Sequence, residues 1–208
     1  MIISDFYQTK IEASNYNVNI DSTDTVITVT LIDFNGVAVS GKSVTLTCDR
    51  GYFNKNGSTA ISGTTTKSIT ATTDSNGKIT ATWTASEWGL ATFSTSNSSQ
   101  PSHIQVNVTG WKTHFNSGEY TVRYNDSFVE VRVHIGSSVT APGAGSEWAD
   151  ILSSSNPDLR PAMPYLFYDT QGKVQLRLSD VSTKMWVRSA SGSNVSQNIY
   201  GMGSYPRR

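Results

Sequence analysis

The sequence is poor in cysteine and in charged residues. It has one cysteine, Cys48, among 208 residues, which excludes an internal disulfide framework and a thiolate metal cluster within one chain. Only 15% of the residues are charged, and 16 basic residues balance 16 acidic ones. Because this composition provides no basic field, we expect no nucleic-acid partner.

Long apolar runs are also missing. No stretch approaches the length needed to cross a bilayer, so we expect no membrane insertion. Residues 1–5 have neither the charged segment nor the apolar segment of a secretory signal, and none is expected.

Sequence motifs for catalysis and metal binding are absent as well. His103, His114 and His134 are isolated, and no His-x-His or His-Glu-x-x-His spacing or Gly-x-Ser-x-Gly elbow occurs. Glu147 and Asp150 could form a glycosidase pair, but their spacing fits the N-terminus of a short helix better. We therefore expect no enzyme, no cofactor and no metal. A minor alternative brings three copies of His134 together on a trimer axis, where they would bind a metal or an anion.

Alternating polarity recurs through the first half, whereas helical periodicity is almost absent. In 25–32, three apolar residues share one face. The turns 33–36 and 74–77 contain Asn-Gly, which tolerates the positive φ of tight connections. About seven short strands in about a hundred residues predict a β-sandwich. The expected strands are 16–20, 25–32, 43–48, 67–72, 78–83, 90–94 and 104–108.

Several large side chains fall at core positions of this sandwich. They are Phe53, Trp83 and Phe93, and Cys48 at the end of an alternating strand is expected to be a small core residue. A nucleophilic Cys48 would need a histidine partner and a lowered pKa, and the sequence indicates neither.

Two separated motifs in this half match a known family. The first comprises 28–31, 33–41 and 44–47, and the second is 72–83. In order and spacing they resemble the bacterial Ig-like domains of intimin- and invasin-type adhesins over about residues 10–110. The resemblance implies a module for display, and it does not say what is displayed.

Composition changes after Gly110 and Trp111, which predicts a domain 1–110 and a second domain 111–208. The first part contains five Lys and one Arg, and the second contains three Lys and seven Arg. Net charges of −2 and +2 are too small to indicate a charged ligand. The higher share of Arg in the second part is typical of residues packed between two protein surfaces, and chance explains it equally well.

The second part is predicted to be β-rich, which makes the whole chain all-β. A hairpin is expected over 119–124 and 128–135, and further strands over 164–168, 173–178 and 184–188. Residues 146–152 are expected to form one or two helical turns, capped by Ser146, with Trp148, Ile151 and Leu152 on one side. The segment 189–208 is expected to order only against a partner.

This second part is similar to the C-terminal head of fibre and baseplate proteins of tailed viruses. The matching segments are 147–152, 159–163, 165–172 and 173–178. The resemblance extends over about residues 118–190, and it departs from the pattern at 153–157. The resemblance implies a homotrimer that touches the host surface.

A burial argument leads to the same expectation. The strands of the second part are short and interrupted, and the tail has few apolar residues. Packing three copies around an axis would supply the missing buried area.

Aromatic residues accumulate near the C-terminus. Exposed aromatic rings stack on the apolar faces of sugars, while Asn, Ser and Arg bond to hydroxyl groups. We expect about two thirds of these aromatics to lie in the core or between subunits. The residues chosen for receptor contact are Trp186, Tyr200 and Tyr205.

Together these features predict a non-enzymatic virion protein of a tailed virus, located on the tail or capsid surface. It would associate with itself and with other virion proteins, and it would attach to a host-surface glycan, cell-wall polymer or protein. Multivalency would make weak single contacts sufficient. The alternative is a capsid or tail decoration protein that displays its Ig-like module without a dedicated receptor. A third possibility, a fragment of a cellular adhesin, is disfavoured by the missing signal.

Overall fold

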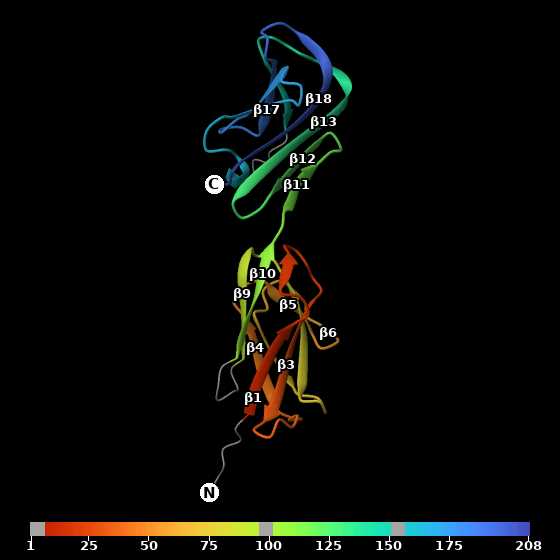
Figure 1. The fold of residues 1–208 in the computed structure, drawn as a ribbon, viewed down its shortest axis with the longest axis vertical. Helices are drawn as coiled ribbons and strands as arrows, with labels where there is room; N and C mark the ends of the chain where they lie inside the picture. Colours follow the sequence, from red (N-terminus) through yellow and green to blue (C-terminus); the bar gives the residue numbers. More distant parts are fainter. Residues whose placement is uncertain (1–6, 96–101, 151–156) are drawn as a thin grey trace. The chain divides into compact units, whose positions relative to one another are not determined.

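The computed structural model describes residues 7–95, 102–150 and 157–208, which divide into two compact units, Met1–Gly110 and Trp111–Arg208 (Figure 1). Its elements are β-strands and one 3-10 turn, η1 (Pro157–Leu159). Within these three stretches no helix has the length and apolar character to cross a bilayer. The described part of the chain is therefore all-β, as expected.

The first unit consists of two five-stranded sheets. Their strand orders are β1-β3-β8-β5-β6 and β2-β10-β9-β4-β7, and the pairing is antiparallel except between β2 and β10. The strands are β1 (Tyr7–Ala13), β2 (Asn17–Asn19), β3 (Thr25–Asp33), β4 (Ser43–Cys48), β5 (Tyr52–Asn56), β6 (Thr59–Ala60), β7 (Ser68–Thr72), β8 (Lys78–Thr84), β9 (Gly89–Thr95) and β10 (His103–Thr109).

This strand order is that of an Ig-like sandwich. Strands β1, β3, β8 and β5 occupy the places of A, B, E and D, and β10, β9 and β4 those of G, F and C. Strand β7 adds an edge beside β4. The sequence did not indicate β1 and β5, because β1 has a single fully buried apolar residue, Ile11, and β5 carries polar residues after Phe53.

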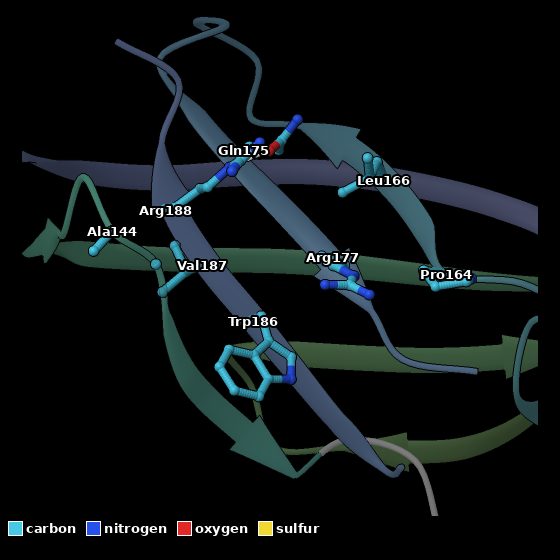
Figure 2. Close-up of a pocket in the computed structure, with 9 residues that line it drawn as sticks. Ala144, Pro164, Leu166, Gln175, Arg177, Trp186, Val187 and Arg188 are labelled. Carbon is cyan, nitrogen blue, oxygen red and sulfur yellow. Dashed lines mark hydrogen bonds between the residues drawn. The ribbon is translucent and has the colours of Figure 1, made fainter. Parts of the chain in front are cut away.

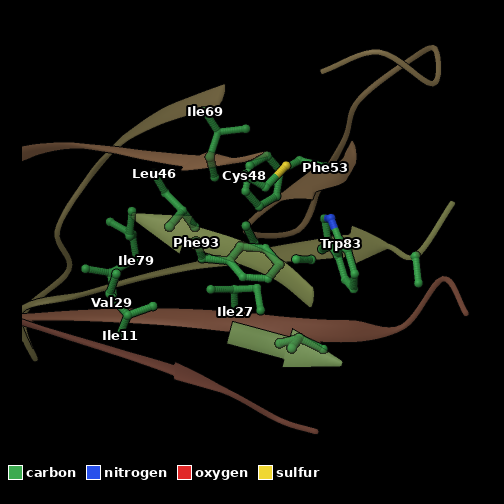
Figure 3. Packing of buried hydrophobic residues seen from close by; sticks show 14 of the residues in the cluster. Ile11, Ile27, Val29, Leu46, Cys48, Phe53, Ile69, Ile79, Trp83 and Phe93 are labelled. Atoms are coloured by element: carbon green, nitrogen blue, oxygen red, sulfur yellow. The ribbon is translucent and has the colours of Figure 1, made fainter. Parts of the chain in front are cut away.

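Strand alternation builds the core of the first unit. Along β3 every second residue from Thr25 to Leu31 is buried, and Phe53, Trp83 and Phe93 are fully buried where they were expected (Figure 3). The ring centroids of Trp83 and Phe93 lie 5.1 Å apart in an edge-to-face arrangement. Burial raises the pKa of the Cys48 thiol to about 11, so Cys48 is a core residue and not a thiolate.

Two Asp-x-x-Gly turns connect the strands of this unit. In each, the Asp side chain accepts hydrogen bonds from the backbone amides two and four residues later, as Asp33 and Asp74 do. Gly36 and Gly77 close these turns with φ of 80° and 69°. A Cβ at Gly77 would lie 2.5 Å from the Leu31 carbonyl oxygen, so this turn requires glycine for space as well.

The second unit also has two sheets, each with four antiparallel strands. The orders are β11-β12-β13-β18 and β14-β17-β16-β15. The hairpin and the three later strands that the sequence predicts are all present. The strands are β11 (Lys112–Asn116), β12 (Tyr120–Tyr124), β13 (Phe128–Ala141), β14 (Ser146–Asp150), β15 (Tyr165–Tyr168), β16 (Val174–Leu178), β17 (Lys184–Ser189) and β18 (Val195–Pro206).

The C-terminal segment corrects one expectation. Residues 195–206 form β18, which pairs with β13 from Phe128↔Pro206 to Ala141↔Val195 within the same chain. The inward side chains of both sheets, including Val131, Leu176 and Ile199, form a core of fully buried residues. The prediction that the second half cannot bury enough apolar surface alone is therefore wrong, and so is the prediction of a tail that orders only against a partner.

Residues 146–150 correct a second expectation, because they form strand β14 and not a helical turn. Strand β14 pairs with β17, and its register shifts between Glu147 and Ala149. This irregularity interrupts the two-residue alternation, so the pattern of residues 146–150 does not indicate a strand. Trp148 packs edge-to-face on Tyr120, with 6.0 Å between the ring centroids. Ile151 and Leu152 lie outside the described residues.

Candidate functional site

The outward face of the sheet β14-β17-β16-β15 presents two rows of side chains. Cross-strand pairing places Leu166 opposite Arg177, Arg177 opposite Trp186, and Trp186 opposite Glu147. The second row consists of Tyr168, Gln175 and Arg188. Their strand neighbours point into the core, so the sheet fixes which residues share the outer face.

A chain of hydrogen bonds fixes the second row. Arg188 Nε donates to Gln175 Oε1 at 2.5 Å, and Gln175 Nε2 donates to the Tyr168 hydroxyl at 3.1 Å. Gln175 is buried, whereas Tyr168 is exposed. The row therefore holds an amide, a phenol and a guanidinium in fixed orientations, and the last two can bond to a ligand as well.

A shallow hollow of about 440 Å³ opens on this face. Trp186, which is 42% exposed, lies on it with Leu166 and Pro164, and Figure 2 shows Arg177 between Trp186 and Leu166. Among the described residues, the Arg177 side chain has no hydrogen bond or ion pair. The hollow thus combines an exposed indole ring with a guanidinium that is available to a ligand.

Charges around the hollow are unevenly distributed. Of the described residues that line it, Arg177 and Arg188 are charged and none is acidic. Glu147, next to Trp186 in the first row, forms an ion pair with Lys184 at 3.0 Å and does not line the hollow. The helix N-terminus that the sequence indicated for Glu147 and Asp150 is wrong, since both belong to strand β14.

This arrangement suits sugar recognition. The face of an indole stacks on the apolar face of a sugar ring, and the polar groups beside it bond to hydroxyls. Within the described stretches no group of three or more His, Cys, Asp or Glu residues could hold a metal ion.

The structure separates the three residues predicted for receptor contact. Trp186 lies on the hollow. Tyr200 is half-buried on the outer face of the other sheet, with its ring centroid 4.8 Å from that of His134. Tyr205 is 2% exposed, and its hydroxyl donates to the Leu159 carbonyl at 2.5 Å, so its prediction as a surface residue is wrong.

Sequence reasoning missed Gln175, Arg177 and Arg188. Their strands were predicted, and the alternation in each strand marks these residues as outward. Placing them in rows with Trp186 and Tyr168 requires the order and register of the strands, which the alternation does not contain.

Comparisons with known proteins give distant structural similarity alone. No protein-family model and no curated protein matches the chain. A structure of the Yersinia pseudotuberculosis adhesin InvE matches 92% of this chain with 16% identity and a TM-score of 0.38, and this chain spans 58% of that protein's chain. Domains 5-6 of the S-layer protein SbsC match 93% of this chain and 95% of theirs, with 12% identity and a TM-score of 0.35.

Proposed function

We propose that this chain is an attachment protein whose second unit binds a surface polysaccharide on the outer face of the sheet β14-β17-β16-β15. The observation that carries the proposal is the exposed Trp186 ring beside the oriented row of Tyr168, Gln175 and Arg188. The Ig-like first unit serves as the module that displays this face.

The same proposal places the protein in the virion of a tailed virus, as part of a tail fibre or baseplate that contacts the host. Its support is the resemblance of residues 118–190 to fibre and baseplate heads. A decoration protein of the capsid or tail is the alternative, and it would bind the particle without binding the host.

The homotrimer belongs to this proposal too, on the resemblance alone. The closed core of the second unit removes the burial argument for it. Three copies would instead multiply a weak contact with the host surface. Sedimentation at micromolar concentration measures the oligomeric state directly. A stable folded monomer would contradict the proposed trimer.

The experiment compares the full chain with its Trp186→Ala variant in adsorption to host cells and to purified cell-wall polysaccharide. We expect the variant to lose at least about tenfold in affinity, since a single aromatic hot spot contributes 2 kcal/mol or more. The matched control is Met202→Ala, because Met202 is an exposed apolar residue on the outer face of the other sheet.

Circular dichroism of both variants checks the fold, which substitutions at exposed positions leave intact. Unchanged adsorption of a folded Trp186→Ala protein would overturn the assignment of this face. Binding to particle shells with none to cells or cell walls would favour decoration instead.

A further inference from the structure

Two more hollows have lining residues in common with the hollow beside Trp186 or with each other. The hollow beside Trp186 shares Gln175 and Arg188 with a second hollow of about 360 Å³, which Gly143 and Gly192 also line. The second shares Ala190 and Ser191 with a third of about 490 Å³, beside Lys173. We call these three hollows, which follow one another along shared lining residues, the groove.

The groove follows the direction of β16 and β17. Trp186, Arg188 and Ala190 line it in turn, and at about 3.3 Å per residue they span about 13 Å. At its far end the Ala190 amide donates to the Lys173 carbonyl at 2.9 Å, so the strands remain joined. This length exceeds what a single small anion would occupy.

Cations are spread along the groove and carboxylates are absent from it. Arg177, Arg188 and Lys173 line it, whereas no Asp or Glu does among the described residues. The nearby Asp169 is 4% exposed and accepts bonds from the backbone amides of Lys173 and Val174 and from the Gln197 side chain. The Asp169 carboxylate therefore binds groups of the protein itself, and Asp169 is not one of the residues that line the groove.

We propose that the groove binds a linear anionic polysaccharide, with successive charged groups meeting Arg177, Arg188 and Lys173. This inference rests on the proposed function and specifies its ligand. The net charge of +2 on residues 111–208 did not indicate an anionic ligand, because binding depends on where the cations lie and not on the total charge. Arg177 and Arg188 line the hollow beside Trp186 and Lys173 lines the third hollow, so one small anion would not reach all three cations, whereas a chain with repeated charges would. Nucleic acid fits less well, because single-strand binding uses a series of stacking aromatics, whereas the described residues that line the groove include two aromatic rings, Trp186 and Tyr168, in different rows of the sheet.

The test measures binding of the full chain to polygalacturonate and to its methyl ester, which keeps the backbone and removes the charge. We expect the ester to bind at least about tenfold more weakly, and binding to polygalacturonate to fall as salt rises. Arg177→Gln should weaken binding about tenfold, and Lys173→Gln less, because ammonium is more strongly hydrated. A phosphorylated polysaccharide in place of polygalacturonate distinguishes phosphate from carboxylate as the source of charge.

The control is Arg132→Gln, which removes the same charge on the outer face of the other sheet and should leave binding unchanged. Equal affinity for the ester and the free acid, or no effect of Arg177→Gln, would overturn the anionic ligand. Tighter binding of single-stranded oligothymidylate than of either polymer would overturn the polysaccharide. The proposed function would survive loss of the anionic ligand if Trp186→Ala still weakened adsorption to cells and to cell-wall polysaccharide, and it would fail separately if Trp186→Ala left adsorption unchanged. A preference for oligothymidylate would overturn the proposed polysaccharide binding as well.

Discussion

At the scale of single residues, Glu130 is a buried carboxylate that two arginines hold. Its side chain lies on the outer face of β13 and is 11% exposed, because two arginines cover it. Arg123 binds both of its oxygens at 2.6 and 3.1 Å, and Arg132 donates Nε at 2.6 Å. Burial alone would raise the pKa of Glu130, but the hydrogen bonds from these arginines outweigh it and hold the pKa below its usual value.

This shift predicts a pH-dependent stability. A carboxylate with a depressed pKa stabilises the fold above its unfolded pKa of 4.5, and this contribution disappears as pH falls through the lower folded value. Glu130→Gln should therefore lower the free energy of unfolding at neutral pH by about 2 kcal/mol. The difference between the variant and the wild type should shrink below pH 4.5. Urea unfolding of both proteins, from neutral pH to below pH 4.5, measures this difference in the free energy of unfolding.

Glu147→Gln is the matched control, since Glu147 is about half exposed and has one ion pair, with Lys184. Its effect at neutral pH should be at most about 0.5 kcal/mol. A Glu130→Gln effect that stays constant from neutral to acid pH would show that packing and not charge is involved.

At the scale of elements, β18 depends on two inward glycines. Gly201 and Gly203 alternate with outward Tyr200 and Met202, and they let β18 approach the other sheet closely. A Cβ at Gly203 would lie 2.9 Å from ring atoms of both Phe167 and Tyr165. The glycines therefore serve as core positions of this strand.

Gly203→Ala should destabilise the second unit by about 2 kcal/mol, because two packed rings would have to shift. The measurement is the denaturant midpoint of unfolding. Ser204→Ala, at the adjacent outward position of β18, should change the free energy by less than about 0.5 kcal/mol. Equal effects of the two substitutions would contradict the close approach of β18 to Phe167.

These elements also explain how far the sequence predicts the fold. Alternation of apolar residues located most strands of both units, and Asn-Gly located the turns, because both signals are local. The alternation in β18 was hidden since two of its buried positions are glycines, and β14 was misread because its register shift breaks the period. Trp186 was identified as a candidate from its residue type, whereas Arg177 joins it only through cross-strand pairing. Tyr205 was misjudged because its burial depends on β18 being a strand.

At the scale of the whole molecule, the described residues form two hydrophobic cores, one in each unit. One consists of buried residues of the first unit, including Trp83 and Phe93, and the other of buried residues of the second, including Val131 and Leu176. Each core is enclosed by the two sheets of its own unit. Each unit therefore has the buried apolar surface that a cooperative unfolding transition requires.

Calorimetry of the full chain should accordingly show two transitions that respond to different substitutions. Phe93→Ala, at a fully buried ring, should cost about 3–5 kcal/mol and lower the midpoint of one transition by more than about 10 °C. Val131→Ala, in the other core, should lower the midpoint of the remaining transition and leave the first in place. A single transition that both substitutions shift would mean that the units unfold together, so that loss of either core also removes the face proposed to bind polysaccharide. Two independent transitions would instead allow that face to persist after the Ig-like unit has unfolded, and polymer binding by Phe93→Ala between the two midpoints would demonstrate it.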